Sequence, residues 1–442
     1  MALPRLPRTL PLWMGVVVLL GTTRCSAPEA PSSPPVAELS QQQLQPDRHV
    51  LYDKVLGMLL GSAIGDAMGA PTEMWSRRDI AIDYGYVTDL DTMVRAPSAE
   101  GTWGYNLPAG GTTDDTRWKQ LLAAFLMKPD VRFGSVEQLN ATDFARHIQQ
   151  TYQRHVDELR AVTGYDPEPF EAVSRRMAWL QEWAPVAEAF AGGDAQAYGM
   201  ALSKFYGGEV TCAGMLYSPM IGAYYPARPE VAYREAYRLS IFDLGYARDI
   251  SSITAAMVSA AMAPHAQPAD VINVLRDVDP QEYFKSRLVG RSAYRMLREA
   301  RAIVHRVGEV PRATLDTLYA PYPRSMPEDT LFWAQMQQAY EQLDLRNQDL
   351  PFHAAEIHLV NLTALLLSDF DFEKALAFVT NYGRDNDTTG AVTGAILGAY
   401  WGASKLPPHL KDAVLRSDAM VMKTNLTGLA EQLTEQMMAR GY

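Results

Sequence analysis

The chain has 442 residues, of which 48% are hydrophobic and 21% are charged, a composition typical of a globular protein with a sizeable core. Its formal net charge of −11 and its pI near 5.3 argue against the basic surface that direct binding of DNA or RNA requires. We therefore expect no nucleic acid among its partners.

Residues 1–25 have the plan of an export signal. Two arginines precede an apolar stretch, residues 10–20, which is too short for a good membrane span, and small and polar residues follow up to Cys25. A cysteine at this place also suits a bacterial lipoprotein, although Arg24 departs from the small residue that lipoprotein processing prefers. The alternatives are a soluble exported protein and a retained N-terminal anchor. We expect a periplasmic or cell-envelope lipoprotein, or a secreted protein, with no membrane attachment beyond an N-terminal anchor.

Residues 26–48 are poor in apolar side chains and predict a flexible tether. The body of the chain, residues 49–442, contains Cys212 as its only cysteine, so a processed chain without Cys25 forms no intramolecular disulfide. Without a disulfide, the stability of the fold must come from packing.

We expect the mature protein to be a monomer.

Helical periodicity dominates this body, and alternating strand patterns are few. Apolar residues are spaced for one face of a helix in two clear segments: Trp118, Leu121, Leu122 and Phe125, and Leu426, Leu429, Leu433 and Met437. Proline clusters at 263–268, 308–328 and 407–408 indicate loops between helices. The sequence predicts one all-α domain, with inserted helices between about 130 and 205 and between about 310 and 350.

Two segments carry glycine at every fourth position. They hold Gly57, Gly61, Gly65 and Gly69, and Gly390, Gly394, Gly398 and Gly402. A step of four keeps the glycines on one stripe of a helix. Each glycine costs a helix up to ~1 kcal/mol relative to alanine, so the stripes need a compensating reason. Close packing of helices is favoured for most of them. Room for a ligand is the alternative for Gly65, Gly69 and Gly390, which lie nearest the acidic residues.

Three polar clusters recur along the body: "GDAMGAPTE" (residues 65–73), "GGTTDDT" (110–116) and "GRDNDTT" (383–389). In the last two, an aspartate pair with flanking threonines precedes a helix, where such residues are preferred caps. Two carboxylates exceed what capping requires, because the second adds repulsion. If the two helix starts converge, Asp114, Asp115, Asp385 and Asp387 meet in one site, where a cation must neutralise them.

A ligand set of carboxylates and hydroxyls, without a convergent histidine or cysteine, suits Mg²⁺ or Mn²⁺ rather than Zn²⁺. A pair of ions a few ångströms apart could bridge such a site. His353 and His358 do not form the zinc-protease motif, and we expect them to be core or loop residues. The chain also has no nucleophile elbow, Walker loop or dinucleotide fingerprint.

Taken together and in this order, "GSAIGDAMGAPTE", "GGTTDDT" and "GRDNDTTGAVTGAILGAYWG" resemble the motifs of the ADP-ribosylglycohydrolase family, which includes dinitrogenase reductase-activating glycohydrolase. The resemblance spans about residues 50–404. It implies a single-domain orthogonal bundle of helices. It also implies hydrolysis of the glycosidic bond between ADP-ribose and a protein side chain or small molecule, assisted by two Mg²⁺ or Mn²⁺ ions.

The resemblance implies roles for individual residues. The metal ligands it implies are Thr113, Asp114, Asp115, Asp385, Asp387 and Thr388. Glu73 matches a family glutamate that lies by the metal site and contacts the substrate in some members. Asp66 is expected to buttress its loop. The general base is expected to be Asp114 or Asp115, with Glu73 as the alternative.

The middle of the chain matches the family less closely. "TCAGMLYSP", residues 211–219, occupies the place of a substrate-loop motif, so Gly214 and Met215 are the expected substrate-binding residues. Thr211 and Leu216 replace the asparagine and arginine that are usual there. Together with residues 242–250, which differ from the pattern of several members, this middle region resembles a less studied branch of the family.

Two further positions also differ from the family pattern. "FDLGYARDI", residues 242–250, stands where several members have a threonine–histidine pair, and Arg384 replaces the second glycine before the C-terminal aspartates. Two other functions stay open. One is an inactive ADP-ribose-binding or structural protein, like the J-crystallins of this family, against which the clustered charges argue. The other is a metal-dependent phosphohydrolase of nucleotide metabolites.

Overall fold

All regular structure in the described part of the chain is helical, so the predicted all-α class is confirmed. The computed structural model describes residues 47–94, 106–128, 139–162, 178–308 and 328–440. The helices are α1 (Arg48–Gly69), α2 (Arg77–Asp83), α3 (Asp114–Leu126), α4 (Ala141–Ala161), α6 (Ala184–Gly192), α7 (Ala195–Lys204), α8 (Ser218–Tyr224), α9 (Pro229–Leu239), α10 (Ala247–Ala261), α11 (Pro268–Asp277), α12 (Ser292–Gly308), α14 (Thr330–Asp344), α15 (Ala354–Leu367), α16 (Phe372–Tyr382), α17 (Asn386–Trp401), α18 (Pro408–Ser417) and α19 (Leu426–Ala439).

The N-terminal predictions fall almost wholly outside these residues. The export signal predicted at residues 1–25 and nearly all of the tether predicted at residues 26–48 are not described, and both stay predictions. Residues 45–442 form one compact unit, in which α1 begins at Arg48. No helix in the described ranges is both long and apolar enough to cross a membrane.

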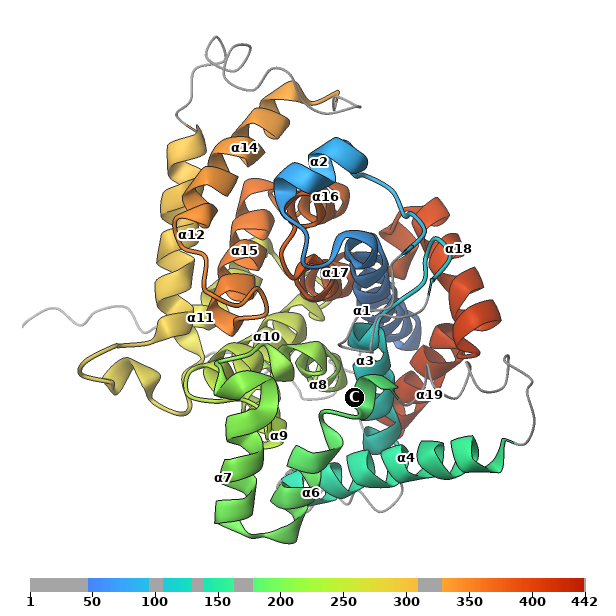
Figure 1. Cartoon of the computed structure of the whole chain (residues 1–442). Helices are drawn as coiled ribbons and strands as arrows, with labels where there is room; N and C mark the ends of the chain where they lie inside the picture. Colours follow the sequence, from blue (N-terminus) through green and yellow to red (C-terminus); the bar gives the residue numbers. More distant parts are fainter. Residues whose placement is uncertain (1–46, 95–105, 129–138, 163–177, 309–327, 441–442) are drawn as a thin grey trace, which may run out of the picture. The chain divides into compact units, whose positions relative to one another are not determined.

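Helices α1 and α17 lie side by side, with their backbones in direct contact (Figure 1). The two stripes of glycine face each other across this contact. A Cβ atom on Gly61 would overlap the carbonyl oxygen of Gly394, and a Cβ atom on Gly65 would overlap that of Gly390. These glycines therefore serve helix packing. For Gly65 and Gly390, the overlap therefore favours helix packing over the alternative of room for a ligand.

The ends of the stripes differ from the sequence pattern. Gly402 is not part of α17 but follows its last residue, with a φ of 82° that favours glycine. Gly69 is the last residue of α1, and a Cβ atom there would overlap the backbone of Asp387. The end of α1 is thus pressed against the first turn of α17. The residues that follow α1 consequently lie beside those that precede α17.

A second layer of small residues lies against this pair. Helix α10 packs on α8, α9 and α17, and nearly all of its residues are buried. Alanine and serine fill much of α10, which lets the neighbouring helices approach closely. The apolar faces predicted for α3 and α19 also point inward, since Trp118, Phe125, Leu426 and Leu433 are buried.

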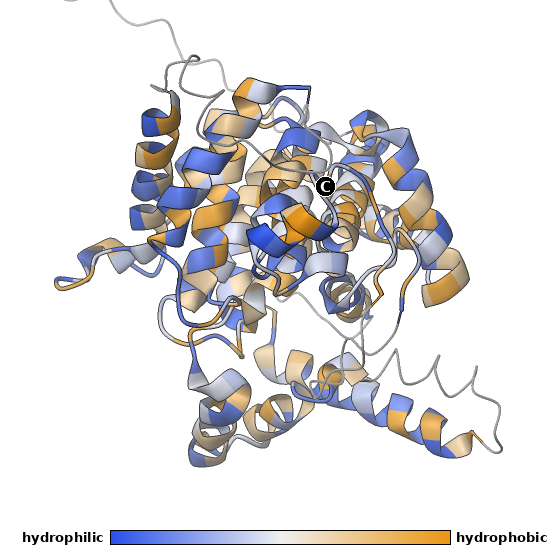
Figure 2. Ribbon diagram, turned by 45° about the horizontal axis from the view of Figure 1, so that its top comes forward, coloured by the Kyte–Doolittle hydropathy of each residue, from blue (hydrophilic) through white to orange (hydrophobic). Residues whose placement is uncertain are grey.

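The remaining helices lie around this core. Helix α15 contacts α12, α16 and α17, while α4 packs on α6 and α6 on α7 (Figure 1). Hydropathy differs in the same way between the central and the outer helices. Pale and orange residues dominate the central helices, and blue residues are more frequent on the outer ones (Figure 2). Helices α4, α6 and α7 form the first predicted insertion. Helix α14 is the described part of the second.

A buried lysine of α1 binds the C-terminal ends of two neighbouring helices. Lys54, in α1, donates hydrogen bonds from Nζ to the carbonyl oxygens of Ala261, Ala399 and Tyr400 at 2.9, 2.9 and 3.1 Å. These carbonyls belong to the last turns of α10 and α17, whose acceptors have no partner within the helix. Lys54 therefore satisfies two helix ends at once, at the opposite end of α17 from the acidic residues.

The glycine contact predicts a strong effect for Gly394→Ala. The added methyl would meet the backbone of Gly61, which cannot rotate away as a side chain can. We expect the free energy of unfolding to fall by about 2 kcal/mol or more, the cost of overpacking a tight core. Urea denaturation followed by circular dichroism measures it.

Gly199→Ala is the matched control. Gly199 lies inside α7, and a Cβ atom there would meet nothing within 4 Å. The control should gain up to ~1 kcal/mol from alanine's higher helix propensity. An unfolding midpoint of Gly394→Ala equal to that of the wild type would contradict the packing argument.

Candidate metal centre

Two helix starts meet in the predicted site. Thr113 is the N-cap of α3, where its side chain accepts a hydrogen bond from the backbone N–H of Asp115. Asp385 is the N-cap of α17, but its carboxylate makes no capping hydrogen bond. Asp114 lies in the first turn of α3 and Asp387 in the first turn of α17. Helix capping therefore does not account for this group of carboxylates.

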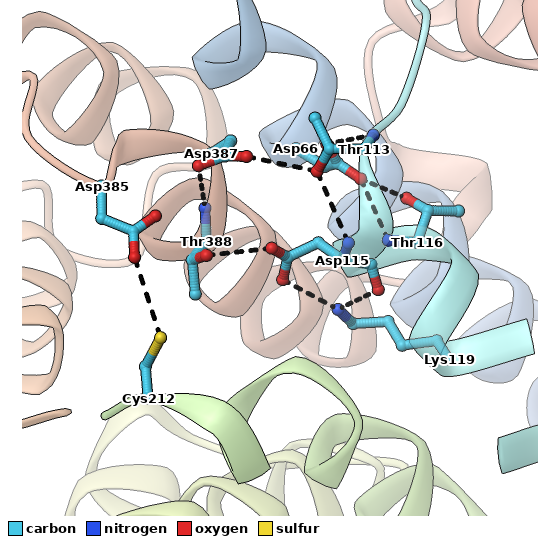
Figure 3. Close-up of polar contacts among 9 residues, drawn as sticks. All are labelled: Asp66, Thr113, Asp115, Thr116, Lys119, Cys212, Asp385, Asp387 and Thr388. Atoms are coloured by element: carbon cyan, nitrogen blue, oxygen red, sulfur yellow. Dashed lines mark hydrogen bonds and ion pairs between the residues drawn. The ribbon is translucent and has the colours of Figure 1, made fainter. Parts of the chain in front are cut away.

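Side-chain contacts join the two helix starts (Figure 3). The Thr388 hydroxyl donates to Asp115 Oδ2 at 2.9 Å, and the Thr113 hydroxyl lies 3.2 Å from Asp387 Oδ2. Each helix start thus contacts a carboxylate of the other. The residues predicted as ligands are all at most 6% exposed: Thr113, Asp114, Asp115, Asp385, Asp387 and Thr388. The structure brings them together, and their role as ligands stays a prediction.

Asp66 holds the start of α3 in place. Its Oδ1 accepts the backbone N–H of Thr113 at 2.9 Å, and its Oδ2 accepts the N–H and hydroxyl of Thr116 at 3.0 and 2.6 Å. The carboxylate is completely buried in α1. Because both of its oxygens are occupied by donors of α3, Asp66 buttresses the loop, as the sequence predicts.

Glu73 joins the acidic residues of α17 in the tightest group of carboxylates. One oxygen each from Glu73, Asp385 and Asp387 lies within 4.8 Å of the other two. A backbone hydrogen bond from Met74 to the carbonyl of Arg384, 2.6 Å long, holds the Glu73 loop beside α17. The sequence assigns Glu73 to catalysis or substrate contact. Its place in this group would also allow Glu73 to hold a metal ion.

Burial makes these carboxylates costly without a cation. It raises the pKa of Asp114 to about 7 and that of Asp385 to about 6, and repulsion from neighbouring carboxylates acts in the same direction. Burial and repulsion also raise the pKa values of Asp115 and Asp387 well above the ordinary range. Asp115 Oδ1 is buried without a hydrogen-bond partner. A hard divalent cation would offset this charge, so the residues fit Mg²⁺ or Mn²⁺.

Lys119 is a buried cation that the sequence analysis missed. Its side chain is 1% exposed, and its Nζ lies 3.5 Å from Asp115 Oδ1 and donates to the Asp115 carbonyl at 3.0 Å. Burial lowers the pKa of Lys119, whereas Asp115 and Asp66 raise it. The sequence signal that could have revealed this pair is its spacing, because a lysine four residues after an aspartate lies on the same side of a helix.

The predicted substrate segment reaches the centre through Cys212, whose thiol donates to Asp385 Oδ2 at 3.7 Å (Figure 3). Gly214 donates its N–H to Asp243 Oδ1 at 2.7 Å, and a Cβ atom on Gly214 would overlap the same carboxylate. Met215 is completely buried in the hydrophobic core. Gly214 and Met215 therefore hold the segment in position, and their contact with substrate stays a prediction.

Arg384 takes a backbone conformation that explains why glycine is usual at its position. Its φ of 64° lies in the left-handed region. The guanidinium donates to both carboxylate oxygens of Glu356 at 2.7 and 2.9 Å and to the Gln348 carbonyl at 2.7 Å. Asn386, two residues further along the chain, donates to Thr72 Oγ1 at 2.8 Å. Both side chains therefore stabilise the loops that frame the centre.

Tyr206 is an aromatic residue near the centre that the sequence analysis did not single out. Its φ is 44°, and its ring lies 4.6 Å from that of Phe205 and 5.2 Å from that of Phe352. Partial burial raises the pKa of Tyr206, and the charges of Asp114 and Asp385 raise it further. The side chain is 40% exposed, so Tyr206 is a candidate for substrate contact. The glycine pair that follows it is the only sequence signal of a turn there.

The two histidines have structural positions, as the sequence predicts. His353 caps α15 by accepting the N–H of Ala355 at Nδ1, 3.2 Å away. His358 is completely buried, which lowers its pKa to about 3. Among the described residues, the group that could hold a metal contains neither of them.

Comparison with known proteins agrees with the motifs. The family model described as ADP-ribosylglycohydrolase matches residues 47–441. The chain belongs to the ADP-ribosylglycohydrolase family. Membership supports a hydrolase that acts on glycosidic bonds, and the buried carboxylates agree with the divalent metals typical of this family. No curated protein matches the chain.

A solved structure described as an "ADP-ribosylglycohydrolase-related protein complex" shares the fold of this family member. It is 18% identical, with a TM-score of 0.51, and the match covers 88% of this chain and 99% of that one. At this identity the likeness concerns the fold alone.

The raised pKa values predict how the stability of the ion-free protein depends on pH. A carboxyl whose pKa is higher in the folded than in the unfolded state keeps a proton on folding, so stability falls as pH rises through the folded pKa. With Asp114 near 7 and Asp115 and Asp387 raised as well, the unfolding temperature in chelator should fall between about pH 6.5 and 8. The buried histidines do not interfere, because burial lowers the pKa of His147 to about 4 and that of His358 to about 3.

Thermal unfolding with excess chelator and with saturating Mn²⁺ measures this dependence. In the sample with Mn²⁺, the unfolding temperature should no longer fall over this pH range, because a bound cation keeps the carboxylates ionised. Asp114→Asn should reduce the decline in chelator. A chelated wild type that gains stability over this window would show that the carboxylates are ionised without a cation.

Proposed function

We propose that this protein is a metal-dependent hydrolase that cleaves the glycosidic bond between ADP-ribose and a protein side chain or small molecule. One observation carries the proposal. The starts of α3 and α17 converge with the end of α1, and this convergence buries Glu73, Asp114, Asp115, Asp385 and Asp387 in one place. A structural protein or a simple binder has no use for such a costly concentration of charge.

The residues divide into two groups that would each hold an ion. Glu73, Asp385 and Asp387 would hold one, and Asp115 with Thr388 would help to hold the other. Bound Mg²⁺ or Mn²⁺ would supply the positive charge that orients a water molecule and fixes the ribose hydroxyls. The same charge would admit the anionic pyrophosphate of ADP-ribose, which the bare carboxylates would repel.

Asp114 is the best candidate for the general base. Asp115 contacts Thr388 through one oxygen and Lys119 through the other, so both of its oxygens are engaged and Asp114 is the better placed of the two to accept a proton. Glu73 is the alternative, and it lies with the other group of carboxylates. The N-termini of α3 and α17 offer backbone N–H groups for the phosphates.

The reaction predicts a product and a metal requirement. Purified protein with Mg²⁺ or Mn²⁺ should release ADP-ribose from at least one member of a panel of arginine-linked, serine-linked and small-molecule-linked substrates. Asp387→Asn should lower turnover by at least about 100-fold and weaken Mn²⁺ binding, because a ligand charge is lost. Chromatography of the nucleotide products and calorimetry of Mn²⁺ binding measure the two effects.

Asp418→Asn is the matched control, since Asp418 is 4% exposed and accepts the N–H of Leu426 at 3.0 Å. This control should keep turnover and Mn²⁺ binding. Release of AMP or phosphate would instead identify a phosphohydrolase. A wild type that leaves the whole panel intact would refute the proposal, and an active Asp387→Asn would refute the ligand assignment.

We also propose that the protein acts outside the cytoplasm. Residues 1–25 support this, because basic residues, an apolar stretch and Cys25 follow each other as in an export signal. Expression of the full chain in a bacterial host should yield envelope-associated protein that lacks the leader. N-terminal mass spectrometry of the wild type and of Cys25→Ser tests it. An intact N-terminus on cytoplasmic protein would contradict export.

A further inference from the structure

Lys119 brings a buried amino group to one end of the acidic centre. Its Nζ is held by the Asp115 carbonyl at 3.0 Å and lies 3.5 Å from Asp115 Oδ1, with both side chains 1% exposed (Figure 3). Because Lys119 and Asp115 are four residues apart in α3, the helix itself fixes this pairing. The ammonium is therefore a fixed part of the site.

The Lys119 ammonium does not pair equally with all the carboxylates of the centre. Asp115 Oδ2 accepts the Thr388 hydroxyl, and Asp115 Oδ1, which has no hydrogen-bond partner, faces Lys119. Asp66 lies nearby but is occupied by Thr113 and Thr116. In the described part of the chain, the only carboxylate within ion-pair distance of Lys119 is therefore that of Asp115.

The opposite end of the centre is formed by Glu73, Asp385 and Asp387. Glu73, Asp385 and Asp387 offer three oxygens within 4.8 Å of one another, and no lysine or arginine among the described residues pairs with Asp385 or Asp387. Three converging carboxylates attract a divalent cation strongly. A cation beside Asp115 must share its ligand with Lys119 and is repelled by it.

We propose that Lys119 makes the two ends of the metal centre unequal, so that a first divalent ion binds at Glu73, Asp385 and Asp387 and a second binds more weakly at Asp115. This inference rests on the proposed function for the presence of two ions. When ions are scarce, the protein then holds one ion, and turnover follows the filling of the Asp115 end. Lys119 is a positioning residue, because it acts through Asp115.

Mn²⁺ titration of the whole purified protein, without substrate, tests this inference. Calorimetry combined with electron paramagnetic resonance of the free Mn²⁺ gives the number of ions bound and the affinity of each step. The wild type should bind two ions with affinities at least about 10-fold apart. Lys119→Met should tighten the weaker step by about 10-fold or more and leave the stronger step nearly unchanged, because only the local repulsion is removed.

Two further variants separate charge from folding. Lys119→Arg keeps the positive charge and should titrate like the wild type. Lys54→Met removes the buried lysine at the other end of α17, so it should lower the unfolding temperature and leave both Mn²⁺ steps unchanged. If Lys119→Met does not fold, the wild-type step separation and Lys119→Arg still decide the matter.

The outcomes distinguish this inference from the proposed function. Two equal steps in the wild type, or a weaker step that is unchanged or weakened in Lys119→Met, would overturn the inference while metal-dependent release of ADP-ribose still stands. A wild type that binds no Mn²⁺ would overturn both. A two-step wild type with the expected Lys119→Met change supports the inference, whichever substrate the enzyme cleaves.

Discussion

The backbone contact between α1 and α17 is the constraint on which the rest of the molecule depends. Gly61 and Gly65 meet Gly394 and Gly390 with no side chain between them. Helices that approach this closely have their ends fixed relative to each other, so the residues just after α1 and just before α17 become neighbours. Glu73 reaches the acidic start of α17 for this reason. The glycines lower the intrinsic stability of both helices, and the close contact offsets that loss.

The second constraint is buried negative charge. Carboxylates are costly inside a protein unless they are paired, and several meet here beside the ammonium of Lys119. The positive ends of two helices reduce the cost, because backbone N–H groups at the starts of α3 and α17 point toward the site. The remaining negative charge agrees with the divalent metals that are typical of the family.

The sequence predicted the helical class, the two glycine stripes and the meeting of "TTDDT" with "RDNDTT" because each rests on a local pattern or on a simple balance of charge. It did not predict that Glu73 lies in the tightest carboxylate group. It also missed Lys119, since a lysine four residues after an aspartate is usually an exposed pair. The role of Arg384 likewise stayed hidden, because Glu356 lies in another helix and only the fold brings them together.

The sequence by itself determined that the body of the chain is helical, which faces of α3 and α19 are buried, and which acidic residues are the candidates for the site. These properties depend on the period of the helix and on side-chain type, both of which are local. Only the tertiary structure decided which oxygen faces which partner: Asp115 Oδ2 toward Thr388 and Oδ1 toward Lys119, and Glu73 toward Asp385. The reason is physical, because these distances depend on how closely separate helices pack, and a contact between backbones fixes that spacing.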